Sequence, residues 1–133
     1  LPYSYHSSIA HLAEASDILL CMLPGGEGTK NAINADILKK LGSTGIFINV
    51  GRGSSVDEVA LAAALQKQHI FAAGLDVYAD EPNVPEELLE QDNVVLLPHI
   101  GSATVETRKA MGQLVIDNLD AYFSGKPLLT EVS

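Results

Sequence analysis

Three charged or ionisable side chains follow short apolar segments of this sequence and could act together on a small anionic molecule. Arg52 comes after the run GIFINVG, His99 comes after NVVLLP, and Glu81 lies just past AAGLDVYAD. An arginine offers a planar fork of donors that matches a carboxylate, while a histidine can exchange a proton near neutral pH. A glutamate that reaches the histidine would orient its ring and favour the protonated form. The three residues therefore predict a site that holds an anion and moves a proton.

The segments that position these residues are predicted to be parallel strands joined by helices. Apolar runs cover 18–23, 46–50, 72–77 and 94–97, and the first is apolar enough to be buried on both faces. A short helix capped by Ser8 is predicted near 9–13, before the first run, and a helix capped by Asn34 is predicted to end at Gly42. The later stretches predict a helix over about 57–68, which starts with a capping box of Ser55 and Glu58, and a helical turn at 85–90. A last helix is expected over about 103–123. This alternation predicts an α/β fold with a parallel sheet, whose ligands bind beyond the carboxyl ends of the strands.

Each candidate residue also has a purely structural interpretation. The turn Gly51-Arg52-Gly53 could be a surface turn with a solvated arginine, although its small neighbours would let a ligand approach the backbone. A lone histidine is more often structural than catalytic, and Glu81 is one of seventeen acidic residues. Asp76 ends an apolar run, where it could bind an amide of a ligand or satisfy the local backbone, and its spacing alone favours the structural role. The order of Arg52, Glu81 and His99 after successive strands is what favours chemistry.

The composition argues against several classes of partner. The 133 residues carry a net charge of −9 at pH 7 and their eight basic residues are scattered, so binding to nucleic acid is not expected. No apolar run approaches the ~20 residues of a membrane helix, and no secretory signal is recognisable. Cys21 is the only cysteine and lies in the run DILLCML, which predicts a buried thiol. The four histidines lack the spacing of metal ligands, so no metal site is expected.

Three blocks of the sequence resemble one known family. INVGRGSSVDEVAL, AAGLDVYADEP and NVVLLPHIGSAT are similar, in order and spacing, to the late motifs of the D-isomer-specific 2-hydroxyacid dehydrogenases. Within that family, PHIGSATVETRKAMG and FSGKPLLTEV are most similar to the glyoxylate/hydroxypyruvate reductases, and especially to the plant-type branch that includes hydroxyphenylpyruvate reductases. The resemblance covers essentially the whole chain.

The resemblance implies a role for each candidate residue. Arg52 would bind the carboxylate and keto oxygen of a small 2-oxo acid, His99 would donate a proton as hydride reaches the carbonyl carbon, and Glu81 would hold His99. Asp76 would contact the nicotinamide carboxamide of NAD or NADP, with NADP slightly favoured by the branch resembled. The residues that would line the cofactor are Leu23, Pro24, Val50, Gly51, Arg52, Asp76, His99, Gly101 and Ser102.

The resemblance also implies that the chain is the C-terminal portion of a longer protein. The family's Gly-x-Gly-x-x-Gly turn does not occur in the sequence, nor do the residues that select NAD or NADP. Residues 1–102 would be the second half of a Rossmann-like, doubly wound cofactor domain, and residues 103–133 a helix and tail that cross back to the substrate domain. We expect this portion alone to be inactive and the longer protein to be a cytoplasmic homodimer. The alternative is a non-catalytic, corepressor-like binding module on the same fold, which has no need of a proton donor.

Overall fold

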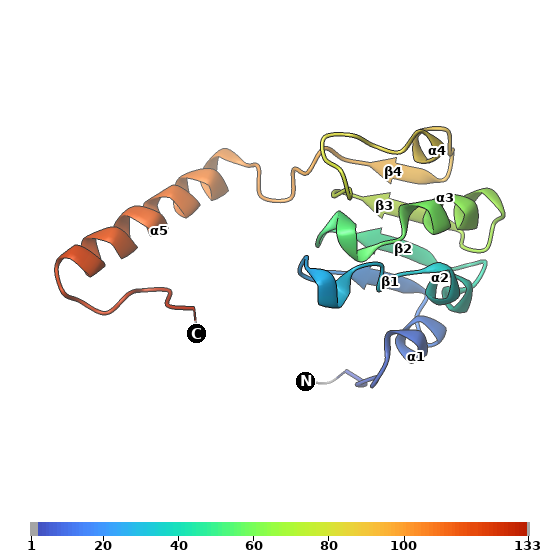
Figure 1. Ribbon diagram of the computed structural model, residues 1–133, viewed down its shortest axis with the longest axis horizontal. Coiled ribbons are helices and arrows are strands. Elements are labelled where there is room, and N and C mark those ends of the chain that lie inside the picture. Colours follow the sequence, from blue (N-terminus) through green and yellow to red (C-terminus); the bar gives the residue numbers. More distant parts are fainter. Residues whose placement is uncertain (1–2, 133) are drawn as a thin grey trace. The chain divides into compact units, whose positions relative to one another are not determined.

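The computed structural model describes residues 3–132, which belong to two compact units, one ending at His99 and one starting at Ile100. The first unit is built on four strands: β1 (Ile18–Cys21), β2 (Ile46–Asn49), β3 (Ala72–Leu75) and β4 (Val94–Leu96). All are parallel, and they lie side by side in chain order (Figure 1). The predicted α/β fold with a parallel sheet is confirmed.

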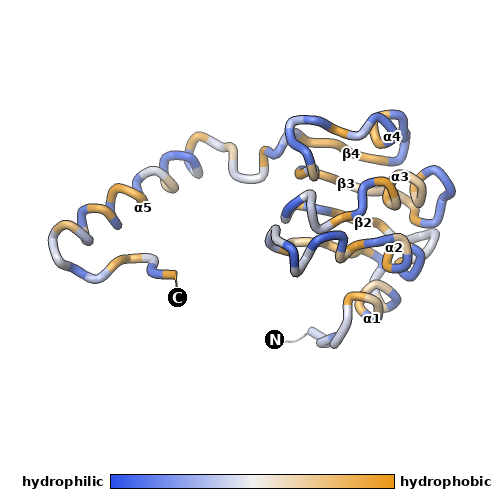
Figure 2. The backbone as a smooth tube through the Cα atoms, viewed as in Figure 1, coloured by the Kyte–Doolittle hydropathy of each residue, from blue (hydrophilic) through white to orange (hydrophobic). Residues whose placement is uncertain are grey.

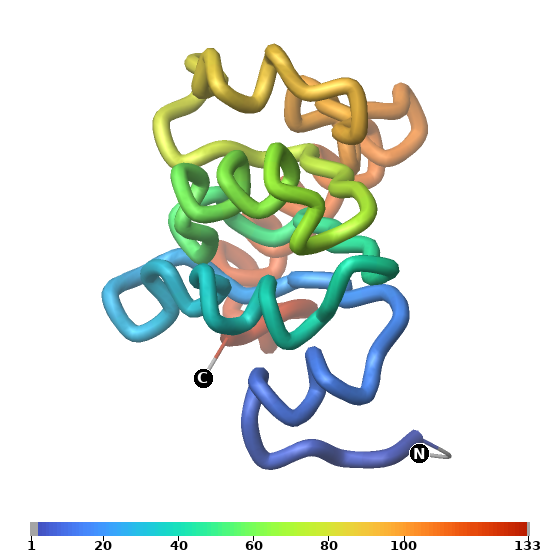
Figure 3. The backbone as a smooth tube through the Cα atoms, turned by 90° about the vertical axis from the view of Figure 1, so that its right-hand side faces the viewer, coloured from blue at the N-terminus to red at the C-terminus, as the bar shows by residue number. Residues whose placement is uncertain are grey.

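One helix precedes the first strand and the others connect successive strands, and they stack in chain order (Figure 3). They are α1 (Ile9–Glu14), α2 (Ala35–Leu41), α3 (Glu58–Gln66) and α4 (Glu86–Leu89), with short 3-10 turns η1 (Glu27–Thr29) and η2 (Gly53–Ser55). Two predicted caps are confirmed, since the Ser8 side chain accepts a hydrogen bond from His11 N and Asn34 Oδ1 accepts one from Ile37 N.

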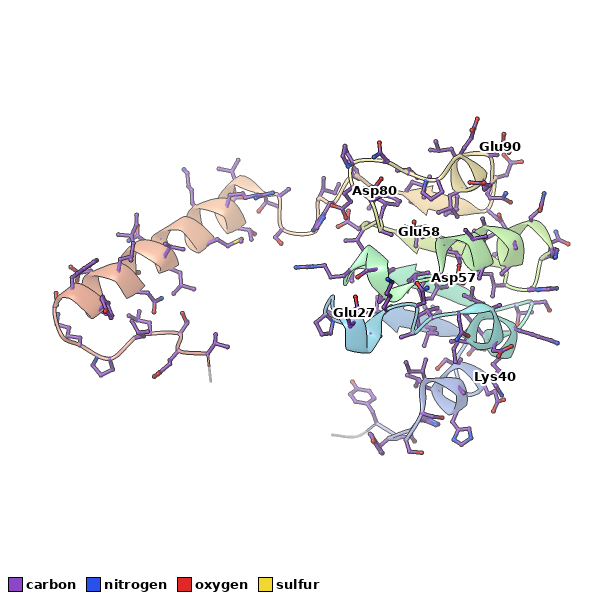
Figure 4. All side chains as sticks on the ribbon, viewed as in Figure 1. Glu27, Lys40, Asp57, Glu58, Asp80 and Glu90 are labelled. Carbon is purple, nitrogen blue, oxygen red and sulfur yellow. The ribbon has the colours of Figure 1, made fainter. Side chains whose placement is uncertain are left out.

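The predicted capping box at the start of α3 is wrong. Asp57 is the N-cap, and its Oδ1 accepts a hydrogen bond from Ala60 N at 3.0 Å. Glu58 instead accepts a hydrogen bond from Ala79 N, in the loop after β3, at 2.9 Å, and both acidic residues are labelled in Figure 4. Ser55 lies in η2, where it is fully buried. Because tertiary partners engage Ser55 and Glu58, the local pattern misplaced the cap by two residues.

Burial alternates along the strands, so the expectation that the first strand is buried on both faces is also wrong. In β1, Leu19 is 4% exposed whereas Leu20 is 52% exposed. Helices that connect parallel strands in chain order all fall on one face of the sheet, because such crossovers are right-handed. The row containing Leu19, Phe47 and Ala73 faces the helices and forms the core with them. In the opposite row, Leu20 and Val95 are exposed and the two residues between them are half-buried.

The second unit consists of helix α5 (Val105–Phe123) and a tail. Its N-cap is Thr104, one residue beyond the predicted start, and hydrophobic residues recur along the helix (Figure 2). The tail folds back onto α5 at Asn118, whose Oδ1 accepts hydrogen bonds from Leu129 N at 3.1 Å and Thr130 N at 3.3 Å. None of the helices within residues 3–132 combines the length and apolar character needed to cross a membrane.

Candidate active site

The predicted site residues of the first unit follow the carboxyl ends of neighbouring strands. Leu23 and Pro24 come after β1, Val50 follows β2, Asp76 follows β3, and His99 comes after β4. Because the four strands are parallel and adjacent, these positions share one edge of the sheet, which is where α/β proteins bind ligands. Gly101 and Ser102 belong to the second unit, and their place in the site stays a prediction.

His99 and Glu81 are in direct contact. The Nδ1 atom of His99 lies 2.7 Å from Glu81 Oε2, while Glu81 Oε1 accepts a hydrogen bond from Tyr78 N at 3.0 Å. The hydrogen bond with His99 lowers the pKa of Glu81, and the bond from Tyr78 N and the charges of His99 and Arg52 lower it further. With Nδ1 directed at a carboxylate, Nε2 is the ring nitrogen that can meet a ligand.

The backbone around His99 is unusual and is braced from the loop after β3. His99 has a φ of 53°, in the left-handed region that residues with a side chain seldom adopt. The Tyr78 hydroxyl donates a hydrogen bond to Leu97 O at 3.0 Å, which ties this loop to the chain two residues before His99. A cavity of about 250 Å³, lined mostly by apolar side chains, lies beside the histidine and Glu81.

Arg52 is exposed on a turn that leaves no room for a side chain on either flank. A Cβ atom on Gly51 would lie 2.7 Å from Leu23 O, and one on Gly53 would lie 1.9 Å from the carbonyl carbon of Tyr78. The Nη1 atom of Arg52 donates a hydrogen bond to Gly51 O at 2.7 Å. The two glycines are therefore required by backbone packing, whatever they also offer to a ligand.

Four further residues hold the site together, and the sequence patterns did not single out their roles: Asn49, Ser55, Glu58 and Tyr78. The side chains of Asn49 and Ser55 donate hydrogen bonds to the backbone oxygen of Arg52. Glu58 accepts one from Ala79 N, and Tyr78 N donates one to Glu81, so both fix the loop that carries Glu81. Each of the four takes part in a hydrogen bond that involves a backbone atom, and the hydrophobic periodicity of a sequence does not reveal such bonds. The one available signal was Asn49, a polar residue within an apolar strand that must find partners when buried.

The edge of the sheet suits the nicotinamide end of a dinucleotide. Val50, at 43% exposure, and the half-buried Leu23 offer apolar contacts. Asp76 is 5% exposed at the end of β3, and its carboxylate oxygens can accept a hydrogen bond from a carboxamide. Across residues 3–132, no three histidine, cysteine or acidic side chains are grouped to hold a metal ion.

Comparison with known proteins supplies the family. Residues 2–101 match the family model described as the NAD binding domain of D-isomer specific 2-hydroxyacid dehydrogenases. The chain belongs to this family. Among its relatives, a hydroxyphenylpyruvate reductase from Plectranthus scutellarioides is 52% identical over 130 residues, which make up 98% of this chain and 42% of that protein. A glyoxylate/hydroxypyruvate reductase from Arabidopsis thaliana is 50% identical over 130 residues, with the same shares of the two chains.

Solved structures of the 2-hydroxyacid dehydrogenase family share the fold. An NADPH-dependent glyoxylate/hydroxypyruvate reductase from Sinorhizobium meliloti, crystallised with NADP and malonate, superposes with a TM-score of 0.96 at 54% sequence identity. The match covers all of this chain and 42% of that one, so the chain spans well under half the length of these relatives. The resemblance drawn from the sequence motifs, including the branch of the family, is confirmed.

Proposed function

We propose that this chain belongs to a longer NAD(P)H-dependent oxidoreductase that reduces a small 2-oxo acid to the D-2-hydroxy acid. Residues 1–102 form the second half of its cofactor domain, and residues 103–133 return to a substrate domain. The observation that carries the proposal is the contact of His99 Nδ1 with the Glu81 carboxylate, at a sheet edge where Arg52 is close enough to lower the pKa of Glu81. A proton donor, its support and a cation are the groups that such a reduction needs.

Each residue has a distinct task in this scheme. The guanidinium of Arg52 holds the substrate carboxylate and polarises the keto oxygen. The cofactor, when bound, supplies the hydride. His99 donates a proton from Nε2 to the carbonyl oxygen, and Glu81 keeps the ring oriented through Nδ1. Asp76 accepts a hydrogen bond from the nicotinamide carboxamide. The cofactor is further lined by the residues after β1 and β2 and by Gly101 and Ser102.

The relatives narrow the choice of substrate and cofactor. Glyoxylate, hydroxypyruvate and hydroxyphenylpyruvate appear in the names of the similar reductases, and each is a 2-oxo acid that Arg52 could hold by its carboxylate. NADPH is favoured over NADH, because the similar reductase from S. meliloti uses NADPH. A cytoplasmic location and a homodimer complete the proposal, and both rest on the family resemblance alone.

Steady-state kinetics of the longer protein test this function. We expect oxidation of NADPH or NADH with at least one of the three 2-oxo acids, and loss of about 100-fold or more of kcat/KM in both Arg52→Ala and His99→Ala. Arg108→Ala, which removes the other arginine of these 133 residues, is the matched control and should keep full activity. A corepressor-like module would instead lack turnover, and its binding function would survive Arg52→Ala. The 133-residue chain by itself should show no turnover, because the glycine-rich phosphate turn is not in its sequence.

A further inference from the structure

The turn that carries Arg52 rests on two buried polar side chains. Asn49 is 1% exposed and Ser55 is 0% exposed. Both donate to the same acceptor, the carbonyl oxygen of Arg52, with Asn49 Nδ2 at 3.1 Å and Ser55 Oγ at 2.6 Å. A buried donor that loses its partner is costly, so these bonds resist any rotation of the Arg52 peptide group.

Asn49 also holds the other side of the turn. Its Oδ1 accepts a hydrogen bond from Gly51 N at 3.1 Å, so a single side chain bonds the backbone both before and after the Cα atom of Arg52. The backbone oxygen of Asn49 accepts a hydrogen bond from Asp76 N at 3.0 Å. The same residue thus links the turn after β2 to the end of β3.

The fixed backbone of this turn also directs the guanidinium of Arg52. Arg52 Nη1 donates to Gly51 O at 2.7 Å, and the Cγ atom of Arg52 would lie 3.4 Å from a Cβ placed on Gly25. The direction of the Gly51 carbonyl therefore decides where the guanidinium points. An arginine side chain has many rotamers, and holding one of them before a ligand arrives reduces the entropy lost on binding.

We propose that Asn49 and Ser55 are positioning residues that fix the direction of the Arg52 guanidinium by holding both sides of its turn. The consequence for a substrate rests on the proposed function: the carboxylate of a 2-oxo acid meets an arginine that is already aimed. When either side chain is lost, the ligand itself must order the turn, so binding weakens more than the chemical step does.

Nitrogen-15 relaxation of the arginine side chains in the 133-residue chain tests the positioning itself. The sequence has two arginines, so the Nε–Hε region holds two signals, and Arg52→Lys assigns them. We expect Ser55→Ala and Asn49→Asp to lower the heteronuclear NOE of Arg52 Nε and to leave that of Arg108 unchanged. Cys21→Ala is the matched control: it removes the Cys21 Sγ atom that is hydrogen-bonded to Ser55 Oγ at 3.4 Å in the same buried cluster, but it leaves both side-chain bonds to Arg52 O in place.

Of the two substitutions, Asn49→Asp poses the greater risk of unfolding the chain. If it does so, the comparison of Ser55→Ala with Cys21→Ala carries the test alone. An Arg52 signal as rigid in Ser55→Ala as in Cys21→Ala overturns the proposal. In the longer protein, Ser55→Ala should raise KM for the 2-oxo acid roughly tenfold with a smaller change in kcat, because the defect is one of orientation. A loosened Arg52 in a protein that reduces no 2-oxo acid would refute the proposed function and leave the positioning role standing.

Discussion

The Nδ1 atom of His99 lies 2.7 Å from the Oε2 atom of Glu81, although eighteen positions of the chain separate the two residues. The loop after β3 makes this contact possible, because Tyr78 N holds the second carboxylate oxygen and the Tyr78 hydroxyl is bonded to Leu97 O. Both partners are solvent-accessible, with side chains 47% and 36% exposed. The pair therefore stands at the surface, where a ligand can reach the imidazole.

Removing the histidine should raise the pKa of Glu81. The native pKa of this carboxyl group is lowered chiefly by the hydrogen bond with His99, so in His99→Ala it should titrate closer to the ordinary value of glutamate. Carbon-13 NMR of the glutamate carboxyl groups measures this. Glu14 is the internal control, because its pKa is lowered by the hydrogen bond with Lys40 and should not move. A Glu81 titration identical in the two chains would contradict the prediction.

The sign of the linkage sets the pH range of the effect. Native Glu81 binds its proton less tightly than the unfolded chain does, so its contribution to stability is present above the ordinary pKa of glutamate. The contribution is lost as the pH falls through the lowered native pKa. The unfolding free energy of the unaltered chain should therefore fall more steeply in acid than that of His99→Ala.

Glu58 should show the opposite dependence on pH. Burial raises its pKa, outweighing the hydrogen bond from Ala79 N, and the charge of Asp80 adds to the rise. The native state thus favours protonated Glu58, and this stabilisation is lost as the pH rises through the raised pKa. Glu58→Gln keeps an acceptor oxygen for Ala79 N without ionising, so its stability relative to the unaltered chain should increase with pH.

Urea unfolding at several pH values measures the effect, with Glu87→Gln, at an exposed position of α4, as the control. The control should show a flat difference from the unaltered chain between about pH 4 and pH 7. If the unfolding free energies of Glu58→Gln and Glu87→Gln change in parallel with pH, the loop does not bury Glu58.

Local patterns in the sequence were enough to locate the strands, the helices and the edge that carries the site. Apolar runs and caps such as Asn34 act within a few residues, and Arg52 and His99 follow strands whose parallel direction could be deduced. The contact between Glu81 and His99 was expected only through the combination of residues, since neither side chain marks the other.

Tertiary relationships account for what the sequence did not reveal. The Tyr78 hydroxyl bonds Leu97 O, and Glu58 leaves its expected cap for Ala79 N, so both side chains join separate segments. Asn49 instead supports its own turn through backbone atoms two and three residues away, which no periodicity marks. Burial on one face of the sheet follows from the strand order β1-β2-β3-β4, which becomes known only when the sheet is assembled.

Gly53→Ala should destabilise the chain by about 3 kcal/mol, because a Cβ atom at this position would lie 1.9 Å from the carbonyl carbon of Tyr78 and backbone must move to admit it. Chemical denaturation measures the loss. Gly28→Ala is the control, since its Cβ meets no atom within 4 Å, and it should change stability by no more than about 0.5 kcal/mol. Equal losses in the two variants would mean that the turn and the loop after β3 are not in contact.

Asn118→Ala should release the tail from α5. The side chain accepts hydrogen bonds from Leu129 N and Thr130 N and donates one to Thr130 Oγ1 at 3.0 Å. Amide exchange at Leu129 and Thr130 should accelerate roughly tenfold, the equivalent of one lost hydrogen bond. Gln113→Ala removes a bond to Asp117 within the same helix and should leave the tail amides unchanged. Unaltered exchange in Asn118→Ala would show that other contacts hold the tail.

Substitution by alanine should lower the unfolding free energy by very different amounts at two adjacent residues of β1. Leu19→Ala should destabilise the chain by about 3 kcal/mol, because this side chain is packed among the helices, 4% exposed. Leu20→Ala should cost no more than about 0.5 kcal/mol, because Leu20 is 52% exposed on the opposite face of the sheet. Urea unfolding of the two variants at low protein concentration gives the comparison. Comparable losses would mean that the second face is covered as well, and a loss in Leu20→Ala that grows with protein concentration would identify another copy of the chain as the cover.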